Sequence, residues 1–374
     1  MSKISIIGAG FAALSAAKKY RKLDPSAEIT LIAPKAEFIY FPSLIWIPSG
    51  LRTGDDLRID LTNFIQKLNL KFHAGRVTGI KNQGRTVITD NGDIENEGLI
   101  IASGGRFLKK LPGIEHALTL CEGISATEKI AQRLKEMESG TIAVGFGGNP
   151  KEPSAMRGGP MFELLFGLDT LLRRQKRRDK FEIVFFTPGA EPGKRLGERA
   201  VTGILKEMEK RNIKTQLGHK LKSFSASNIT TEGGEFAADL ILFMPGMTGP
   251  QWLDNTELPR SAGGLIEANE NTKIMGFDKI YVAGDTGSFP GPKWMPKQAH
   301  MADLQADTAA LNLFGELNNK ATNAIFKIEL ICIIDTLDKG ILVFRNMKRT
   351  IVFPCKLLHF AKRGFEKLYL RKYR

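Results

Sequence analysis

Cysteine and histidine are scarce in this chain, and neither residue is clustered. The three cysteines, Cys121, Cys332 and Cys355, lie far apart without a C-x-x-C pair, and the five histidines are equally scattered. A disulfide framework needs more cysteines, and a zinc site needs ligands at short, regular spacing. The sequence therefore predicts neither a disulfide-stabilised secreted protein nor a metal site.

A long apolar run is also missing. No segment reaches the roughly 18 apolar residues of a membrane-spanning helix. The N-terminal MSKISIIGAGFAALSAA has the lysine, the apolar stretch and the small residues of a short signal peptide, but Gly8 and Gly10 within it also fit a strand, a glycine turn and a helix. We favour the second interpretation and expect a protein that is made and kept on the cytoplasmic side.

Acidic residues are in deficit. The 374 residues include 54 Lys and Arg against 40 Asp and Glu, which gives a formal net charge of +14. Such a chain is attracted to phospholipid headgroups, nucleic acid or anionic substrates. The basic cluster at 173–178 comes without aromatic or groove-reading elements, so we expect no nucleic-acid partner. A chain of 374 residues is long enough for two domains, and its 42% hydrophobic residues suffice to fill their cores.

The first motif that carries chemistry is the glycine turn GAGFAA at 8–13, which follows a buried strand and opens an alanine-rich helix that extends to about Leu23. In a dinucleotide-binding fold the first glycine permits the tight turn, the second lets the backbone approach a pyrophosphate, and a small third residue allows close helix packing. The helix N-terminus then faces the phosphate charge. The alternative is a tight turn without a ligand. The candidate cofactor contacts are Gly8, Gly10, Ala12 and Ala13.

The strand EITLIA after this helix lacks the acidic residue that usually ends the second strand of such a fold. Ala33, Pro34 and Lys35 stand there instead. We therefore do not expect a carboxylate to recognise the ribose, and Lys35 becomes the candidate contact for phosphate or ribose.

A second signal comes late in the chain, in KIYVAGDTG at 279–287. Its apolar strand places Gly284 and Asp285 at the carboxyl edge of a sheet, where open α/β sheets bind ligands. The alternative is that Asp285 caps the next helix.

The middle of the chain begins another glycine turn, VGFGGNP at 144–150, without completing it. Pro150 and Pro153 prevent a helix from continuing directly out of the turn, and the next helix starts near Pro160. The following strand, FEIVFFTPG at 181–189, ends without a carboxylate for an adenosine ribose. We therefore expect a Rossmann-like domain without a well-formed NADH site. A loop that is merely inserted is the alternative.

The chain resembles the flavoproteins with two dinucleotide-binding folds on three motifs, which occur in the expected order: GAGFAA at 8–13, LIIASGG at 99–105 and YVAGD at 281–285. The resemblance implies that these segments surround FAD. It implies further that Asp285 binds the ribityl chain of FAD and that Ser103 and Gly104 lie near the adenosine.

The same resemblance implies an α/β fold with two Rossmann-like dinucleotide-binding domains and a C-terminal amphipathic segment that associates with membranes. The FAD-binding domain is expected in two parts, at 1–115 and 246–320. The second Rossmann-like domain, with a degenerate nucleotide site, is expected at 116–245. The region 321–374 is expected to serve redox chemistry, quinone binding and membrane anchoring.

Three further segments are similar to sulfide:quinone oxidoreductases and their flavocytochrome relatives, and the similarity extends over residues 3–374: FIYFPSLIWIPSG at 38–50, MPKQAHMA at 295–302 and FEKLYLRKYR at 365–374. The similarity implies that Pro42 packs near the flavin and that Lys297 lies at the isoalloxazine, beside the quinone pocket. A cation there would stabilise the negative charge of the reduced flavin. The alternative for Lys297 is a solvated lysine at a helix start.

In this resemblance Cys332 matches a redox cysteine, and Cys121 matches a third cysteine near the substrate entrance. Sulfide chemistry needs a polarizable thiolate that takes up sulfur and passes electrons to the flavin. The other redox cysteine should fall in SAMRGGPMFE at 154–163, where a methionine and an arginine stand. An intact pair of redox cysteines is therefore missing, unless Cys121 or Cys355 takes the place of the second cysteine. The alternatives are a buried Cys332, a structural Cys121 and a Cys355 within a tail helix.

The C-terminal segment at 353–374 interleaves apolar residues with lysines and arginines at helical spacing. An apolar stripe flanked by cations is typical of a helix that lies in a membrane interface, and anionic lipid attracts such a helix. Because quinones reside in the bilayer, a peripheral anchor suits a quinone reductase. A tail that packs on the protein's own core, with its cations outward, is the alternative.

The leading hypothesis is a membrane-peripheral FAD enzyme on the cytoplasmic side that passes two electrons from sulfide, or a related reduced sulfur compound, to a membrane quinone. Cys332, Cys121 and Lys297 are its candidate catalytic residues. A type II NADH:quinone oxidoreductase is the first alternative, and a flavin-bound protein that docks at membranes without sulfide turnover is the second. The sequence leaves self-association open.

Overall fold

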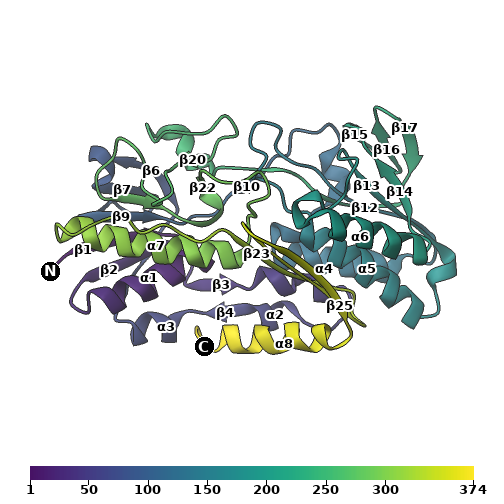
Figure 1. Cartoon of the computed structure of the whole chain (residues 1–374), viewed down its shortest axis with the longest axis horizontal. Coiled ribbons are helices and arrows are strands. Elements are labelled where there is room, and N and C mark those ends of the chain that lie inside the picture. Colours follow the sequence, from purple (N-terminus) through teal and green to yellow (C-terminus); the bar gives the residue numbers. More distant parts are fainter.

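The computed structural model describes residues 1–374, apart from the side chain of Cys121. Two five-stranded parallel sheets form its two halves, which lie side by side in Figure 1. The first sheet has the order β21-β9-β1-β2-β5, and the second has the order β11-β18-β12-β13-β14. The expected α/β fold with Rossmann-like parallel sheets is therefore confirmed.

The first sheet takes its strands from both ends of the chain: β1 Lys3–Ile7, β2 Glu28–Ala33, β5 Lys71–Ala74, β9 Gly98–Ile101 and β21 Ile280–Val282. Two helices, α1 Phe11–Leu23 and α7 Ala299–Leu317, pack against each other and against this sheet. Their small side chains allow this close approach. The alanines that the two helices bury are Ala12, Ala13, Ala16, Ala17, Ala302, Ala306, Ala309 and Ala310.

The second sheet consists of β11 Ala117–Leu118, β12 Gly140–Phe146, β13 Phe181–Thr187, β14 Lys214–Leu217 and β18 Leu240–Met244. Its helices are α4 Ile124–Glu136, α5 Gly159–Arg174 and α6 Glu198–Lys210. The helix that the sequence predicts near Pro160 and the strand that it predicts at 181–189 are observed as α5 and β13. The long connection from β12 to α5, at 147–158, is also observed.

Small antiparallel elements surround the two sheets. They are β3 Glu37–Ile39 with β4 Arg58–Asp60, β6 Val77–Lys81 with β7 Thr86–Thr89 and β8 Ile94–Glu95, β10 Arg106–Phe107 with β19 Met247–Thr248, and β15 Leu221–Phe224 with β16 Asn228–Thr231 and β17 Gly234–Ala237. The strands β20 Ile266–Glu267 and β22 Gly287–Ser288 pair in parallel. The short helices α2 Gly54–Leu57 and α3 Thr62–Lys67 lie beside β4 in the chain.

The C-terminal region forms an antiparallel sheet of β23 Glu329–Asp335, β24 Gly340–Asn346 and β25 Thr350–Cys355, followed by α8 Leu357–Leu370. In Figure 1 α8 runs along the lower edge of the molecule. Cys355 ends a strand, opposite Gly340, so its assignment to a tail helix is wrong. Within the described part of the chain, no helix has the length and apolar character needed to cross a membrane.

The basic cluster at 173–178 is structural as well as solvated. Arg173 and Arg178 turn back to Asp169, a fully buried carboxylate of α5, and Arg211 at the end of α6 reaches the same carboxylate at 2.9 Å. Burial raises the pKa of Asp169, but the hydrogen bonds from the three arginines outweigh burial and hold the pKa below its ordinary value. This buried cluster joins α5 to α6.

Replacing Asp169 by Asn removes the buried carboxylate that Arg173, Arg178 and Arg211 share, although Arg211 keeps its ion pair with Glu207 at 2.6 Å. We expect the free energy of unfolding to fall by about 3–5 kcal/mol, the cost of breaking a buried ion pair. The loss should be full above about pH 4 and should shrink as the pH falls through the lowered pKa, because wild type then loses the same charge. Urea unfolding at pH 7 and at pH 3 measures both effects.

The matched control is Glu182→Gln, which removes an exposed ion pair with Lys214. This change should cost less than about 1 kcal/mol. Equal losses in the two variants would contradict a structural role for the Asp169 cluster.

Candidate functional site

A cavity of about 1840 Å³ reaches the carboxyl ends of both parallel sheets. Residues that directly follow β1, β2, β9 and β21 line it in the first sheet, and residues that follow β12 and β13 line it in the second. The helices α5, α7 and α8 and the strand β23 supply further walls. Because open α/β sheets bind ligands at this edge, the cavity is the candidate functional site.

The glycine turn after β1 forms one end of the cavity. Gly8 has a φ of +119°, and a Cβ there would lie 2.3 Å from the carbonyl oxygen of Ala102, so a larger residue does not fit. Gly10 precedes α1, which has no side-chain cap, and nothing lies within 4 Å of a Cβ built on Gly10. Ala12 lines the cavity and Ala13 is fully buried. The first N–H groups of α1 are therefore placed to bind phosphate oxygens.

Charged side chains beyond β2 lie at the same end. Lys35 is exposed and lines the cavity, where it can contact phosphate or ribose. Glu37, the first residue of β3, also lines the cavity, and it pairs with Arg58 at 3.4 Å. A carboxylate thus reaches the cavity although none ends β2. The sequence pattern missed Glu37 because it lies beyond a turn rather than at the strand end.

Pro42, Ser103 and Gly104 also line the cavity. The Ser103 Oγ accepts a hydrogen bond from Trp252 Nε1 at 3.4 Å, and the carbonyl oxygen of Gly104 accepts one from Thr286 Oγ1 at 2.9 Å. The second bond fixes the segment after β9 against the segment after β21. The structure therefore brings together the three segments that carry the flavoprotein resemblance.

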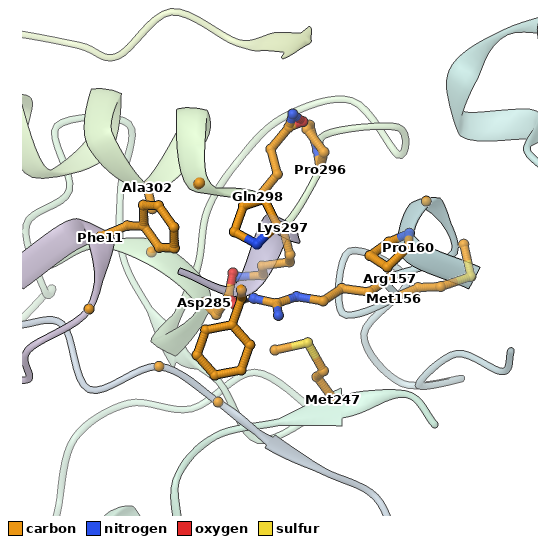
Figure 2. A pocket seen from close by; sticks show the side chains of 18 of the residues that line it. Phe11, Met156, Arg157, Pro160, Met247, Asp285, Pro296, Lys297, Gln298 and Ala302 are labelled. Atoms are coloured by element: carbon orange, nitrogen blue, oxygen red, sulfur yellow. Dashed lines mark hydrogen bonds and ion pairs between the residues drawn. The ribbon is translucent and has the colours of Figure 1, made fainter. Parts of the chain in front are cut away.

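Asp285 follows β21 and lines the cavity. Gly284 before it has a φ of +75°, and its N–H donates to Gln305 Oε1 at 3.0 Å, which fixes the turn. The carboxylate of Asp285 forms an ion pair with Arg157, from the loop before α5, and Figure 2 shows the two side chains meeting. Asp285 does not cap an α-helix, since the next one, α7, starts at Ala299.

Lys297 is a half-buried residue of the cavity wall rather than a solvated lysine. Its Nζ donates to the carbonyl oxygen of Gly287 and lies 5.7 Å from the ring centre of Phe289. Burial lowers the pKa of Lys297 to about 7, the Glu152 carboxylate opposes this change, and the charge of Arg157 adds to it. Lys297 can therefore gain or lose a proton at neutral pH, so the cation that the resemblance implies there depends on pH.

Cys332 faces the cavity from β23, opposite the start of α5, and a Cβ on Gly159 would lie 3.9 Å from its Sγ. Burial raises the pKa of this thiol to about 12, the Glu163 carboxylate adds to the rise, and Lys362 opposes it. At neutral pH Cys332 is therefore a protonated thiol and not the thiolate that sulfur chemistry needs.

Among the described side chains, Cys355 does not complete a pair with Cys332. The side chain of Cys121 lies outside the described part of the structure. Cys355 is half-buried and is not among the residues that line the cavity. Met156 and Arg157 stand where the resemblance puts the second redox cysteine, and both line the cavity. In the part of the chain that the structure describes, no group of three or more His, Cys, Asp or Glu could hold a metal ion.

The loop at 147–158 is fixed in place by its own polar side chains. Asn149 Nδ2 donates to the carbonyl oxygens of Met247 and Gly263 at 2.9 and 3.0 Å. The Glu152 carboxylate accepts from Ser288 Oγ at 2.8 Å. The loop therefore packs against segments that follow the second sheet in the chain, instead of running from the glycine turn straight into α5.

Glu163 on α5 and Lys362 on α8 form a buried ion pair in the cavity wall. Burial raises the pKa of Glu163 to about 7, although the charge of Lys362 opposes the rise. Neither Glu163 nor Lys362 was predicted from the sequence to belong to the site. The available signal was weak: one acid within the apolar run MFELLFGL, and one of many lysines in the tail.

The cavity reaches the surface between β23 and α8. Ile331 and Phe365 line it, yet they remain 41% and 59% exposed. Ile333 and Ala361 line the same opening from the same two elements. This mouth of the cavity is therefore apolar, whereas exposed charged residues such as Lys35 and Glu191 line the cavity elsewhere.

Comparison with a protein-family model places these features in context. The model for the pyridine nucleotide-disulphide oxidoreductases matches residues 2–152 and 170–306. Two similar proteins are named type II NADH:quinone oxidoreductase. The protein of Staphylococcus epidermidis is 24% identical over 344 residues, and that of Staphylococcus aureus is 24% identical over 346 residues. In both cases the match covers 86% of this chain and 84% of the relative.

Solved structures share the fold. The sulfide:quinone oxidoreductase from the hyperthermophilic bacterium Aquifex aeolicus superposes with a TM-score of 0.90 at 22% identity, over 100% of this chain and 92% of that chain. The NAD-dependent persulfide reductase from A. fulgidus superposes with a TM-score of 0.72 at 18% identity, over 92% of this chain and 64% of that chain.

Replacing Gly8 by Ala tests the cofactor end of the cavity. A Cβ would overlap the carbonyl oxygen of Ala102, so the turn must shift, and we expect the FAD content of the purified protein to fall at least about tenfold. The ratio of flavin to protein absorbance measures this content. The control is Gly203→Ala within α6, where nothing lies within 4 Å of the added carbon. A Gly8 variant with full FAD content would exclude phosphate binding at this turn.

Proposed function

The chain belongs to the pyridine nucleotide-disulphide oxidoreductase family, and we propose that it is a membrane-peripheral enzyme that passes two electrons from sulfide, or a related reduced sulfur compound, to a membrane quinone. The chain is an FAD-dependent oxidoreductase. The donor, the quinone, the site residues and the membrane location are the parts that we propose.

The cavity suits FAD. The start of α1 and the turn at Gly8 and Gly10 offer backbone N–H groups to the phosphates, Gly104 leaves room for close approach, and Asp285 offers a carboxylate to the ribityl hydroxyls. When bound, FAD accepts two electrons from one substrate and passes them to another. The protein supplies binding, orientation and charge around it.

The observation that carries the proposal is the orientation of α8. This helix buries charged and polar side chains, among them His359 and Glu366 at 7% and 4% exposure. It exposes large apolar ones instead: Leu357 at 72%, Phe360 at 60%, Phe365 at 59% and Leu368 at 62%. The helix also buries Tyr369 and Leu370 near its end, but an amphipathic helix on a protein in water buries its large apolar side chains more fully. The apolar stripe of α8 is therefore explained by contact with lipid.

The neighbouring sheet extends the apolar surface of α8. On β25, Ile351 and Phe353 are 41% and 55% exposed, and Ile331 on β23 is also exposed. Cations flank the stripe, which suits anionic headgroups: Lys356, Lys367, Arg371 and Lys372 are exposed. The mouth of the cavity lies within this surface, at Ile331 and Phe365. A quinone could thus pass from lipid to the cofactor without crossing water.

The sulfur donor is supported by Cys332 and by the whole-chain likeness to a sulfide:quinone oxidoreductase. The thiol of Cys332 must lose its proton before it can take up sulfur. Glu163, whose pKa is raised to about 7 by burial, is close enough to affect the thiol and can accept a proton at neutral pH. We propose that Glu163 and Lys362 govern the ionisation of Cys332.

A second candidate is NADH oxidation, which is favoured by the relatives that are named type II NADH:quinone oxidoreductase. Gly147 and Gly148 line the cavity, and Glu191 beyond β13 lines it too. Against NADH, the loop that follows the glycine turn is held by Asn149 and Glu152, so the turn does not open a helix. A third candidate, membrane docking without turnover, predicts slow flavin reduction by every donor.

The donor is tested by anaerobic stopped-flow reduction of the flavin with sulfide or NADH. We expect sulfide to bleach the flavin faster than NADH, and Cys332→Ser to slow the sulfide reaction by roughly 100-fold or more. Cys355→Ser, whose side chain does not line the cavity, should react like wild type. Faster bleaching by NADH would replace sulfide with NADH as the donor, and an unaffected Cys332 variant would remove its catalytic role.

Membrane binding is tested by sedimentation with vesicles that contain anionic lipid. Replacing Phe360 and Leu368 by Gln removes two exposed side chains, each worth about 1.5–3 kcal/mol when fully buried, so binding should weaken at least tenfold. The control replaces Met275 and Ile325 by Gln. Each of these side chains is 61% exposed and lies outside α8 and the C-terminal sheet. Equal effects of the two double variants would exclude α8 as the docking element.

A further inference from the structure

Charged side chains from several segments gather at the cavity: Arg157, Arg195, Lys297 and Asp285 line it, and Glu152 lies near enough to act on Lys297. Most of them are engaged by protein groups. The Arg195 guanidinium donates to backbone carbonyl oxygens of the segments 154–156 and 293–295. The Glu152 carboxylate accepts from serine hydroxyls, and the Lys297 ammonium donates to a carbonyl oxygen.

Arg157 is different. Among the contacts of the described residues its guanidinium donates to Asp285 alone, and its Nε is buried without a partner. A guanidinium offers five N–H donors in a rigid fork. A buried donor without a partner costs about 1–3 kcal/mol, so a side chain placed in this way indicates a ligand with acceptor atoms beside Asp285.

The surroundings identify the ligand as the cofactor. A Cβ on Gly284 would lie 3.1 Å from the Cβ of Ala12, so Asp285 directly follows a residue that touches the phosphate turn. Arg157 reaches Asp285 from the opposite side, out of the loop before α5, as Figure 2 shows. Its guanidinium therefore meets a bound FAD beyond the phosphates, toward the flavin.

We propose that Arg157 is a cofactor-binding residue, which shares Asp285 with the ribityl chain, donates to acceptor atoms at the flavin end of FAD, and stabilises the negative charge that FAD gains on reduction. This role requires that FAD binds in the cavity, and it does not depend on the proposed donor or quinone. It belongs to the residue that stands in the stretch where the resemblance expects a second redox cysteine.

The rigidity of the loop supports this role. Arg195 Nη1 donates to the carbonyl oxygen of Met156, and Asn149 and Glu152 fix the loop further upstream. A charge that is held in place before the cofactor is reduced costs no reorganisation during the reaction. Arginine also keeps its charge at every physiological pH. Lys297 does not, since burial lowers its pKa to about 7. Arg157 therefore supplies a permanent cation at the site where the sequence resemblance implies a cation at Lys297.

The test compares the FAD-loaded wild type with Arg157→Gln, Arg157→Lys and Arg199→Gln. Arg199 is exposed on α6, so its replacement changes the net charge equally but outside the cavity. Two quantities are measured without sulfide, NADH or quinone: the midpoint potential of the bound FAD, by titration with redox dyes, and the rate of FAD release after dilution, by flavin fluorescence. Failure of the proposed donor or acceptor leaves both measurements unaffected.

We expect Arg157→Gln to lower the midpoint potential and to release FAD at least about tenfold faster, because one charged hydrogen-bond donor is lost. Arg157→Lys should have a midpoint potential close to that of wild type, because it keeps the positive charge. It should still release FAD about threefold faster, because lysine lacks the paired N–H donors of the guanidinium. A Gln variant that folds, as judged by circular dichroism, but purifies without FAD also supports the inference.

The inference is overturned if Arg157→Gln lies within twofold of wild type in FAD release at an unchanged potential, or if Arg199→Gln changes both quantities as much. If Arg157→Gln does not fold, the Lys variant decides. A Lys variant equal to wild type in both measurements then excludes Arg157 as a cofactor-binding residue.

Discussion

The site depends on how buried charges hold the C-terminal helix. Breaking a buried pair leaves an uncompensated charge, so such pairs hold Lys362 and Glu366 of α8 against the protein, with several large apolar side chains of the helix left exposed. The hydroxyl of Tyr369 adds a bond to Asp303 of α7 at 2.9 Å. One set of contacts thus closes the wall of the cavity and creates the apolar surface around its mouth. The ion pairs that hold α8 are Lys362 with Glu163 and Arg52 with Glu366, and a hydrogen bond joins His359 to Asp335.

The parts of the fold that follow from neighbouring residues could be predicted from the sequence. The strand, glycine turn and alanine-rich helix at the N-terminus are specified within one short segment, and they were predicted with nearly correct ends. The contacts that hold α8 could not be predicted in this way, because Glu163 and Lys362 are 199 residues apart and Arg52 and Glu366 are 314 apart. Helical spacing shows which tail residues share a face, but not which face meets the protein.

The chemistry of single residues was the least predictable part. A motif gave the positions of Cys332 and Lys297 on the cavity wall, yet burial moves the pKa of both groups toward their neutral forms. Burial depends on distant segments, which one sequence does not order in space. The names of the two similar proteins, type II NADH:quinone oxidoreductase and sulfide:quinone oxidoreductase, agree on a quinone and differ on the donor. In the structure, the apolar mouth at α8 bears on the quinone that both names contain. The loop before α5 bears on the donor, on which the two names differ.

The position of the cavity mouth on the apolar face of α8 has a consequence for kinetics. Where α8 lies on a bilayer, enzyme and quinone meet by lateral diffusion in two dimensions. The encounter rate then follows the number of quinone molecules per area of membrane and not their amount per volume of solution. Diluting the aqueous phase would leave turnover unchanged, whereas adding empty lipid would slow it.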